Sequence, residues 1–172
     1  MFGNRAKTLQ ACGSFLPFFL RFVEENAGKK AVDWVAMADT AAVTAWSGIA
    51  FENVCFNHIK QIKACLGISG VSTSESLWSK RGDEDSEGTQ IDLIIERKDH
   101  VINMCEIKFV GDEFTVTRDY HLLLERRKRL LYEKIPNKAA IHCTLITSFG
   151  LRRAEHFSDI ISTIPLEDLF RE

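Results

Sequence analysis

The chain has 172 residues, of which 45% are hydrophobic and 27% charged, and only 3 are prolines. This size and composition suit one globular domain with a sizeable core, and they exclude collagen-like, coiled-coil and disordered classes. The 22 basic and 24 acidic side chains give a formal net charge of -2. A nucleic-acid partner would therefore have to be met by a local basic patch.

The cysteines and the N-terminal segment predict a cytoplasmic protein. The 5 cysteines contain no C-x-x-C pair and sit mostly among apolar residues, which is typical of reduced core thiols. Residues 15–20 are apolar and follow Arg5 and Lys7 as in a signal peptide, but Arg21 interrupts them and no small-residue cleavage site follows. No run of about 20 apolar residues is present, so we expect no membrane partner.

Helical spacing of apolar residues marks the first third of the chain. It predicts a short helix over residues 15–26 and more helical material over residues 35–45. The clearest helix is expected from Ile49 to Leu66, opened by Gly48 and stopped by Gly67. Residues 69–88 lose this spacing and suggest a strand or two with an exposed loop.

The rest of the chain predicts a hairpin followed by further helices and a strand. Ile91–Glu96 and Val101–Phe109 are β-rich runs separated by residues 97–100. The later elements are expected to be a helix, a buried strand and a last helix: Tyr120–Lys134, Ile141–Thr147 and Leu151–Ile161. This order predicts an α/β (α+β) protein with a central mixed sheet and helices on both faces.

Both faces of the hairpin are apolar, which supports a sheet buried on both sides. One face is expected to carry Ile91, Leu93 and Ile95, and the other Ile94, Ile102 and Met104. We expect two parts: a helical N-terminal segment over residues 1–45, either a remnant of a larger protein or packed on the core, and a sheet domain over residues 46–172.

Three charged residues interrupt the apolar hairpin. Asp92 lies in its first strand, and Glu106 and Lys108 lie two residues apart in its second, on one sheet face. Asp92 shares that face if it pairs near Glu106. This pairing requires a three-residue turn, such as Lys98-Asp99-His100, or a bulge in one strand.

These residue types indicate metal-dependent hydrolysis of a phosphodiester. Two carboxylates in a semi-buried site repel each other, and one takes up a proton unless a cation neutralises them. Because no histidine or cysteine cluster is near, Asp92 and Glu106 suit Mg²⁺ or Mn²⁺. Lys108 would orient or deprotonate a water and meet charge that develops on a phosphate. The alternative is a structural ion network.

The sequence resembles the PD-(D/E)xK, or restriction-endonuclease-like, nuclease superfamily. The resemblance rests on Gly88-Thr89-Gln90-Ile91-Asp92-Leu93 followed by Glu106-Ile107-Lys108, with Ile91 where the signature has proline. Trp46-Ser47-Gly48-Ile49-Ala50-Phe51-Glu52, Leu66-Gly67-Ile68 and Leu166-Glu167-Asp168-Leu169-Phe170 further resemble the C-terminal nuclease-like domain of certain prokaryotic AAA-type ATPases.

The resemblance implies a restriction-endonuclease-like fold over residues 46–172. It also implies that Glu52, on the first core helix, completes the metal shell of Asp92 and Glu106, although Glu52 could instead be solvent-exposed. The implied function is cleavage of DNA, or less readily RNA, as the C-terminal part of an ATPase. A homodimer is open as a further partner arrangement. The chain has no G-x-x-x-x-G-K-[ST] motif, so we expect a stand-alone or excised C-terminal piece. The alternative is a catalytically silent module that binds DNA or a protein partner for an ATPase.

A basic run lies on the helix that is expected to follow the hairpin. Arg126, Lys128 and Arg129 are candidate contacts to a phosphate backbone, but such a run is also typical of a solvated helix face. Tyr120 and His121, near the start of the same helix, are candidates to approach the site, but Tyr120 is rather expected to pack in the core or an interface.

Overall fold

The computed structural model describes residues 40–82, 88–135 and 139–171. These residues fall into two units, which are treated separately: the helix α4 (Ala41–Asn57) and everything from His58 onward. The predicted helix over residues 15–26 lies outside the described ranges. Within them, no helix is long and apolar enough to cross a membrane.

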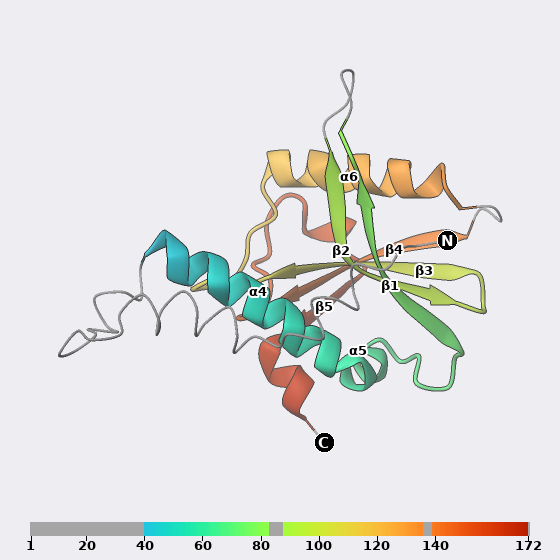
Figure 1. The fold of residues 1–172 in the computed structure, drawn as a ribbon, viewed down its shortest axis with the longest axis horizontal. Helices are drawn as coiled ribbons and strands as arrows, with labels where there is room; N and C mark the ends of the chain where they lie inside the picture. Colours follow the sequence, from blue (N-terminus) through green and yellow to red (C-terminus); the bar gives the residue numbers. More distant parts are fainter. Residues whose placement is uncertain (1–39, 83–87, 136–138, 172) are drawn as a thin grey trace. The chain divides into compact units, whose positions relative to one another are not determined.

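Five strands of the second unit form one mixed sheet in the order β1-β2-β3-β4-β5 (Figure 1). Strands β1 (Thr73–Lys80), β2 (Thr89–Arg97) and β3 (Val101–Lys108) are antiparallel neighbours. Strands β4 (Ala140–Thr147) and β5 (Ser162–Pro165) run parallel to β3. The predicted hairpin and the predicted strand Ile141–Thr147 are therefore confirmed.

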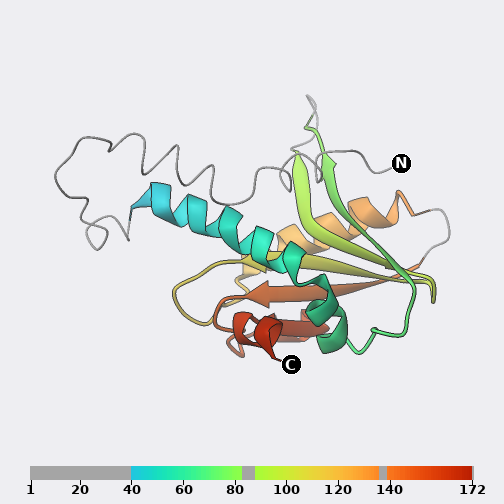
Figure 2. The same cartoon turned by 60° about the horizontal axis from the view of Figure 1, so that its bottom comes forward.

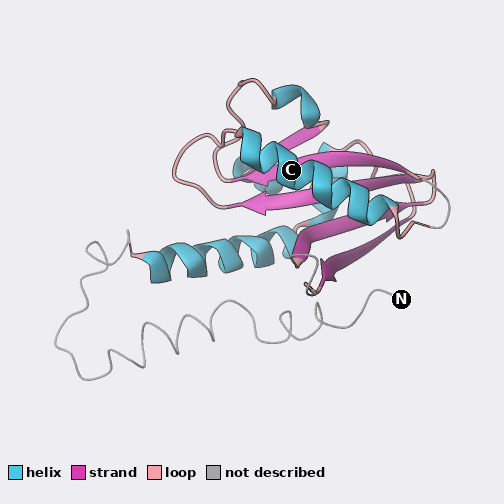
Figure 3. Ribbon diagram, turned by 90° about the horizontal axis from the view of Figure 1, so that it is seen from above, coloured by secondary structure: helices cyan, strands magenta, loops and turns pink. Residues whose placement is uncertain are grey.

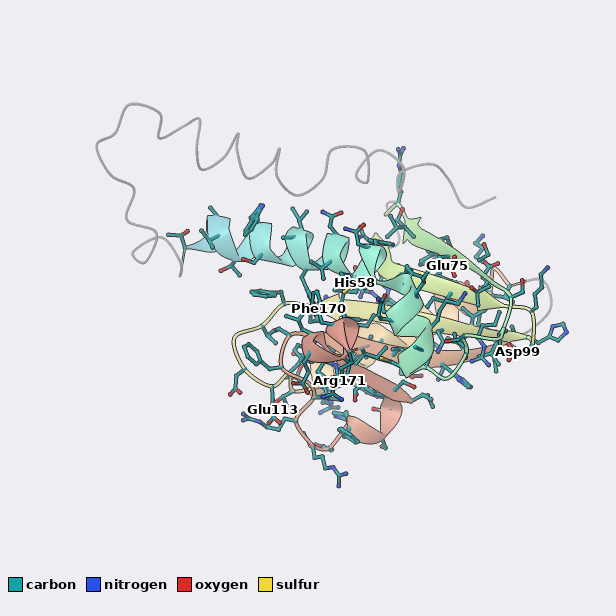
Figure 4. The ribbon with its side chains drawn as sticks, turned by 90° about the horizontal axis from the view of Figure 1, so that it is seen from below. His58, Glu75, Asp99, Glu113, Phe170 and Arg171 are labelled. Carbon is teal, nitrogen blue, oxygen red and sulfur yellow. The ribbon has the colours of Figure 1, made fainter. Side chains whose placement is uncertain are left out.

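Helical segments cover both faces of this sheet. Helix α6 (Arg118–Tyr132) lies across the strands on one face, as Figure 3 shows. On the opposite face, α5 (Ile59–Cys65) packs beside the 3-10 helix η4 (Leu166–Phe170) (Figure 2). The ring of His58, just before α5, lies 4.7 Å from the ring of Phe170 (Figure 4). The predicted class, a central mixed sheet with helices on both faces, is confirmed.

Helix α6 forms where the sequence predicts a helix, and it supplies one side of the core. Thr117 caps its start, because its hydroxyl oxygen accepts the backbone N–H of Tyr120 at 3.3 Å. Its buried residues Leu124 and Leu131 pack into one apolar cluster with residues of the sheet. The sheet residues of that cluster include Trp78, Ile91, Ile94, Ile102, Met104, Cys143 and Leu145.

The turn between β2 and β3 has the predicted three residues, Lys98 to His100. His100 is left-handed, with φ 64°, as is common for the last residue of a three-residue hairpin turn. The Arg97 guanidinium holds the turn by donating to the Asp99 carboxylate, 2.9 Å from Nε to Oδ1. That hydrogen bond lowers the pKa of Asp99.

Replacing His100 by glycine is expected to raise the free energy of unfolding by about 0.5–1 kcal/mol, since the left-handed penalty of a residue with a Cβ disappears. Lys98→Gly is the matched control in the same turn. Within the described ranges His100 alone among non-glycine residues has positive φ, so Lys98→Gly should lose about 0.5–1 kcal/mol. Urea denaturation measures both, and equal losses would show that the turn stores no such strain.

The predicted helix Ile49–Leu66 is wrong in its bounds. Helix α4 already begins at Ala41, because the Thr40 hydroxyl oxygen accepts the backbone N–H of Val43 at 3.4 Å, so Gly48 lies inside it. The helix breaks at His58, whose φ of -112° and ψ of 29° leave the helical region, and α5 follows. The predicted stop at Gly67, with φ 68°, is confirmed.

The predicted helix Leu151–Ile161 is also wrong. Leu151 forms a parallel bridge with Phe114 instead, and a 3-10 helix, η3 (Phe157–Asp159), is the helical structure within the segment. The backbone N–H of Ile161 donates to the Cys143 carbonyl oxygen at 2.9 Å, which leads the chain into β5. Pairing with distant segments therefore overrides the local spacing of apolar residues.

The cysteines are buried with one exception among the described residues. Cys55, Cys105 and Cys143 are buried, as predicted, whereas Cys65, the last residue of α5, is exposed. Burial raises the pKa of Cys143 to about 12, and the nearby charge of Glu106 adds to this effect. Cys143 is therefore an inert core thiol at neutral pH.

Candidate active site

The candidate site lies where β2 and β3 separate. Their pairing runs from Glu96 opposite Ile102 to Leu93 opposite Cys105, and it goes no further toward the start of β2. Beyond this point β1 and β2 continue together as a two-stranded arm (Figure 1). The strand ends of the hairpin therefore open at the place where the charged residues occur.

A β-bulge in β2 marks the separation. The register of β2 against β1 shifts between the pairs Ser76–Ile94 and Trp78–Ile91, so β2 has one more residue than β1 in this interval. As a result Ile91 and Ile94 belong to the same cluster under α6. The prediction that they lie on opposite faces is wrong, because the bulge breaks the alternation of side chains.

Asp92 lies within this bulge and bonds across the gap to β3. Its Oδ2 accepts the backbone N–H of Ile107 at 3.0 Å and lies 3.9 Å from Lys108 Nζ. The side chain thus satisfies a backbone donor in place of the missing strand partner. Only 8% of Asp92 is exposed.

Glu106 is fully buried beneath α6. Its Oε2 accepts hydrogen bonds from the Arg127 guanidinium and from the Tyr120 hydroxyl, the latter at 3.4 Å. Arg127 also donates through Nε to Thr89 Oγ1 at 3.2 Å, which ties α6 to the start of β2. Within the described chain, the second carboxylate oxygen, Oε1, is buried without a hydrogen-bond partner.

The buried pair of carboxylates controls the electrostatics of the site. Burial, and after it the charge of Asp92, raise the pKa of Glu106 to about 7. Arg127 and Lys108 lower it by less. Burial and the charge of Glu106 also raise the pKa of Tyr120 far above its ordinary value, so its hydroxyl remains a hydrogen-bond donor.

Lys108 borders the same site at the end of β3. It is half-buried, and its Nζ lies 5.7 Å from the centre of the Tyr120 ring, within the range of a cation-π contact. The strand end is fixed because the Ser148 backbone N–H donates to the Lys108 carbonyl oxygen at 3.3 Å. The Ser148 hydroxyl also bonds the backbone N–H and carbonyl of Val110, at 2.8 and 2.6 Å.

The donor set suits a hard divalent cation. Glu106 Oε1 is an unpartnered buried carboxylate oxygen in the described part of the chain, and Asp92 contributes a second carboxylate whose charge acts on Glu106. Mg²⁺ and Mn²⁺ take oxygen ligands of this kind. Arg127 supplies positive charge to the pair through its bond to Glu106.

The other predicted site residues lie on the helices α4 and α6. Glu52 is half-buried on α4, in the other unit, and its role as a ligand stays a prediction. In the basic run, Lys128 pairs with Glu125 at 3.7 Å on the surface, and Arg129 is exposed. Arg126 is half-buried, and contact of these three residues with a phosphate backbone stays a prediction.

Sequence reasoning did not predict Arg127 as a site residue, and it assigned Tyr120 to the core or an interface. Both lie on the buried stripe of α6, since residues 120, 124, 127 and 131 recur at a spacing of four, three and four. Leu124 and Leu131 on that stripe are buried. A basic residue in register with two buried leucines was therefore the signal that Arg127 points inward to a buried acid.

Comparisons with known proteins leave the family open. No family model matches the sequence, and no curated protein matches it either. Among solved structures, the chain is similar to a protein of unknown function, AF1548, with 13% sequence identity and a TM-score of 0.42. The alignment covers 67% of this chain and 64% of that one. A likeness at this level carries no argument about function.

Proposed function

We propose that this protein is a metal-dependent phosphodiesterase of the restriction-endonuclease-like type, with DNA as its substrate and RNA as a second possibility. The proposal is supported by one observation above all: Asp92 and the fully buried Glu106 share a site with Lys108 where two strands part. Burying like charges together is costly, and such arrangements are more typical of functional sites than of structural ones.

In this proposal each residue has a distinct role. Asp92 and Glu106 would hold Mg²⁺ or Mn²⁺, which supplies Lewis acidity and a water of lowered pKa. Lys108, which is partly exposed beside Asp92, orients the attacking water and meets negative charge on the phosphate. Tyr120 and Arg127 position the Glu106 carboxylate. Association with an ATPase, and dimerisation, belong to the same proposal.

The first test is Asp92→Ala in a plasmid-nicking assay with Mg²⁺ or Mn²⁺, together with calorimetric titration of the metal. We expect nicking to fall by about 100-fold or more and metal binding to be lost, while the far-UV spectrum is retained. Asp112→Ala is the matched control, since Asp112 is an exposed acid that pairs with Arg152 at 3.0 Å. Equal nicking by Asp92→Ala and wild type would refute the proposal.

A second function, a catalytically silent module, is favoured by the Arg127–Glu106 ion pair, because the buried acid already has a cation beside it. Such a module would bind DNA or an ATPase partner in EDTA, and Lys108→Ala would bind equally well. Binding that weakens steeply with salt would indicate nucleic acid, and salt-insensitive binding would indicate a protein. Absence of both metal binding and nicking in the wild type would favour this second function.

A further inference from the structure

Two histidines and a carboxylate converge at a second place, on residues that the proposed active site does not use. His121 lies in the first turns of α6, His156 directly precedes the short helix η3, and Asp159 is its last residue. His121 Nδ1 lies 2.7 Å from Asp159 Oδ2, and His156 Nδ1 lies 3.6 Å from the same oxygen. Taking one ligand atom from each residue, the three atoms lie within 4.8 Å of one another.

Local structure accounts for this convergence. Residues three apart in a 3-10 turn project on the same side, so His156 and Asp159 face one way, and the Asp159 backbone N–H donates to the His156 carbonyl oxygen at 3.3 Å. The imidazole of His121 then stacks on that of His156, with ring centres 4.5 Å apart and an angle of 8° between planes. All three residues are partly buried.

Each of the three side chains has one buried polar atom that makes no hydrogen bond within the described residues. His121 Nδ1, His156 Nε2 and Asp159 Oδ2 are buried and have no hydrogen-bond partner among the residues described. His121 Nδ1 and Asp159 Oδ2 are close enough for a hydrogen bond, yet they are not aligned as one. Buried polar atoms without partners are uncommon and often mark an ion or water that completes them.

We propose that His121, His156 and Asp159 form a binding site for a divalent transition-metal ion, with Zn²⁺ as the ion of choice. Two imidazoles and one carboxylate are a frequent zinc donor set that leaves a fourth position for water. Ligands about 2.0–2.2 Å from a tetrahedral ion lie roughly 3.3–3.6 Å apart. The 3.6 Å between His156 Nδ1 and Asp159 Oδ2 matches this spacing. The 2.7 Å between His121 Nδ1 and Asp159 Oδ2 is shorter and must widen when an ion binds. This nitrogen-rich set differs in kind from the all-carboxylate site of Asp92 and Glu106.

The stacking of the His121 and His156 rings predicts that one ring changes orientation when a metal ion binds. Nitrogen lone pairs of two parallel imidazoles lie in parallel planes, so they do not point at one ion. One ring must turn when the metal binds, and the stack between His121 and His156 must open. The ring-proton resonances of these two histidines should therefore shift on zinc addition more than those of His58 or His142, which lie outside the cluster.

The test is calorimetric titration of the tag-free 172-residue chain with ZnCl₂, and with CoCl₂ followed by absorption spectroscopy. Both are done in excess MgCl₂, so that the proposed Asp92–Glu106 site is already occupied. We expect one ion per chain, and His156→Gln and Asp159→Asn should each weaken binding by more than about ten-fold. His100→Gly, which removes an exposed histidine, and Glu106→Gln should retain the wild-type affinity. The cobalt spectrum should show tetrahedral d–d bands without a thiolate charge-transfer band, because no cysteine is a ligand.

Three outcomes would overturn the proposal. They are absence of one-to-one zinc binding by the wild type, unchanged affinity in both cluster variants, and a thiolate band in the cobalt spectrum. Loss of binding in Glu106→Gln alone would instead assign the ion to the Asp92–Glu106 site. Thermal melts of the metal-free variants show whether they are folded, and the cobalt spectrum of the wild type tests the ligand set independently of any variant.

Discussion

Arg127→Met is expected to lower the free energy of unfolding at pH 8 by about 3–5 kcal/mol, as is typical when one partner of a buried ion pair is removed. Methionine keeps most of the aliphatic stem of arginine, so the packing of α6 is largely preserved. What is lost is the guanidinium that bonds both Glu106 and Thr89. The fully buried Glu106 carboxylate is then left with its charge uncompensated on that side.

Two controls distinguish this effect from a general weakening of α6. Arg129→Met changes the same residue type on the exposed side of the helix and should alter stability by less than about 0.5 kcal/mol. The double variant Arg127→Met with Glu106→Leu removes both charges and should recover most of the loss. Urea denaturation of the wild type, Arg127→Met, Glu106→Leu and the double variant closes the cycle, and equal losses at positions 127 and 129 would contradict the prediction.

The pH dependence of stability is the second large effect. The pKa of Glu106 is raised from 4.5 to about 7 in the folded protein, chiefly by burial. Between these values the folded state keeps a proton that the unfolded state releases, so stability falls as pH rises through this window. Since one pKa unit corresponds to about 1.36 kcal/mol, the full difference is about 3 kcal/mol.

Glu106→Gln isolates this contribution, because glutamine does not titrate. We expect the wild type to lose about 3 kcal/mol relative to the variant between pH 4.5 and pH 8. The contributions of all other groups are common to the two proteins and cancel in the difference. Denaturation curves at several pH values measure it, and a difference that stays constant with pH would show that Glu106 ionises normally.

The proposed metal site couples to the same proton. If Mg²⁺ binds the ionised Glu106, metal binding at pH 6 must displace a proton, because ligands bind in their deprotonated form. The silent-module alternative has no such coupling. Calorimetry in buffers of different ionisation enthalpy would therefore distinguish the two functions through proton release.

Sequence reasoning located the hairpin and its charges because both depend on local pattern. The β-rich runs around residues 97–100 fix a three-residue turn, and the turn brings Asp92 toward Glu106. What local pattern does not contain is the partner of a buried charge. From its neighbours in sequence, Arg127 belongs to a solvated basic run. Its inward position becomes evident only because it shares a helix face with the buried Leu124 and Leu131.

The errors in element boundaries have a related physical origin. Residues 151–161 have helical spacing, but Leu151 forms a bridge with Phe114 and the Ile161 N–H donates to the Cys143 carbonyl oxygen, both partners being far away in sequence. The bulge at Asp92 likewise depends on a register between β1 and β2 that neither strand specifies alone. Such features follow from tertiary pairing, so a single sequence gives no direct signal of them.

The short strand β5 also affects how the sheet meets other chains. Within the described residues β5 is the last strand of the sheet, and it is only four residues long. It ends in Pro165, which has no backbone N–H to offer a foreign strand. Short edges that carry proline resist edge-to-edge growth into aggregates. This end of the sheet is therefore a poor template for amyloid-like association, even though the strands beside it are rich in isoleucine.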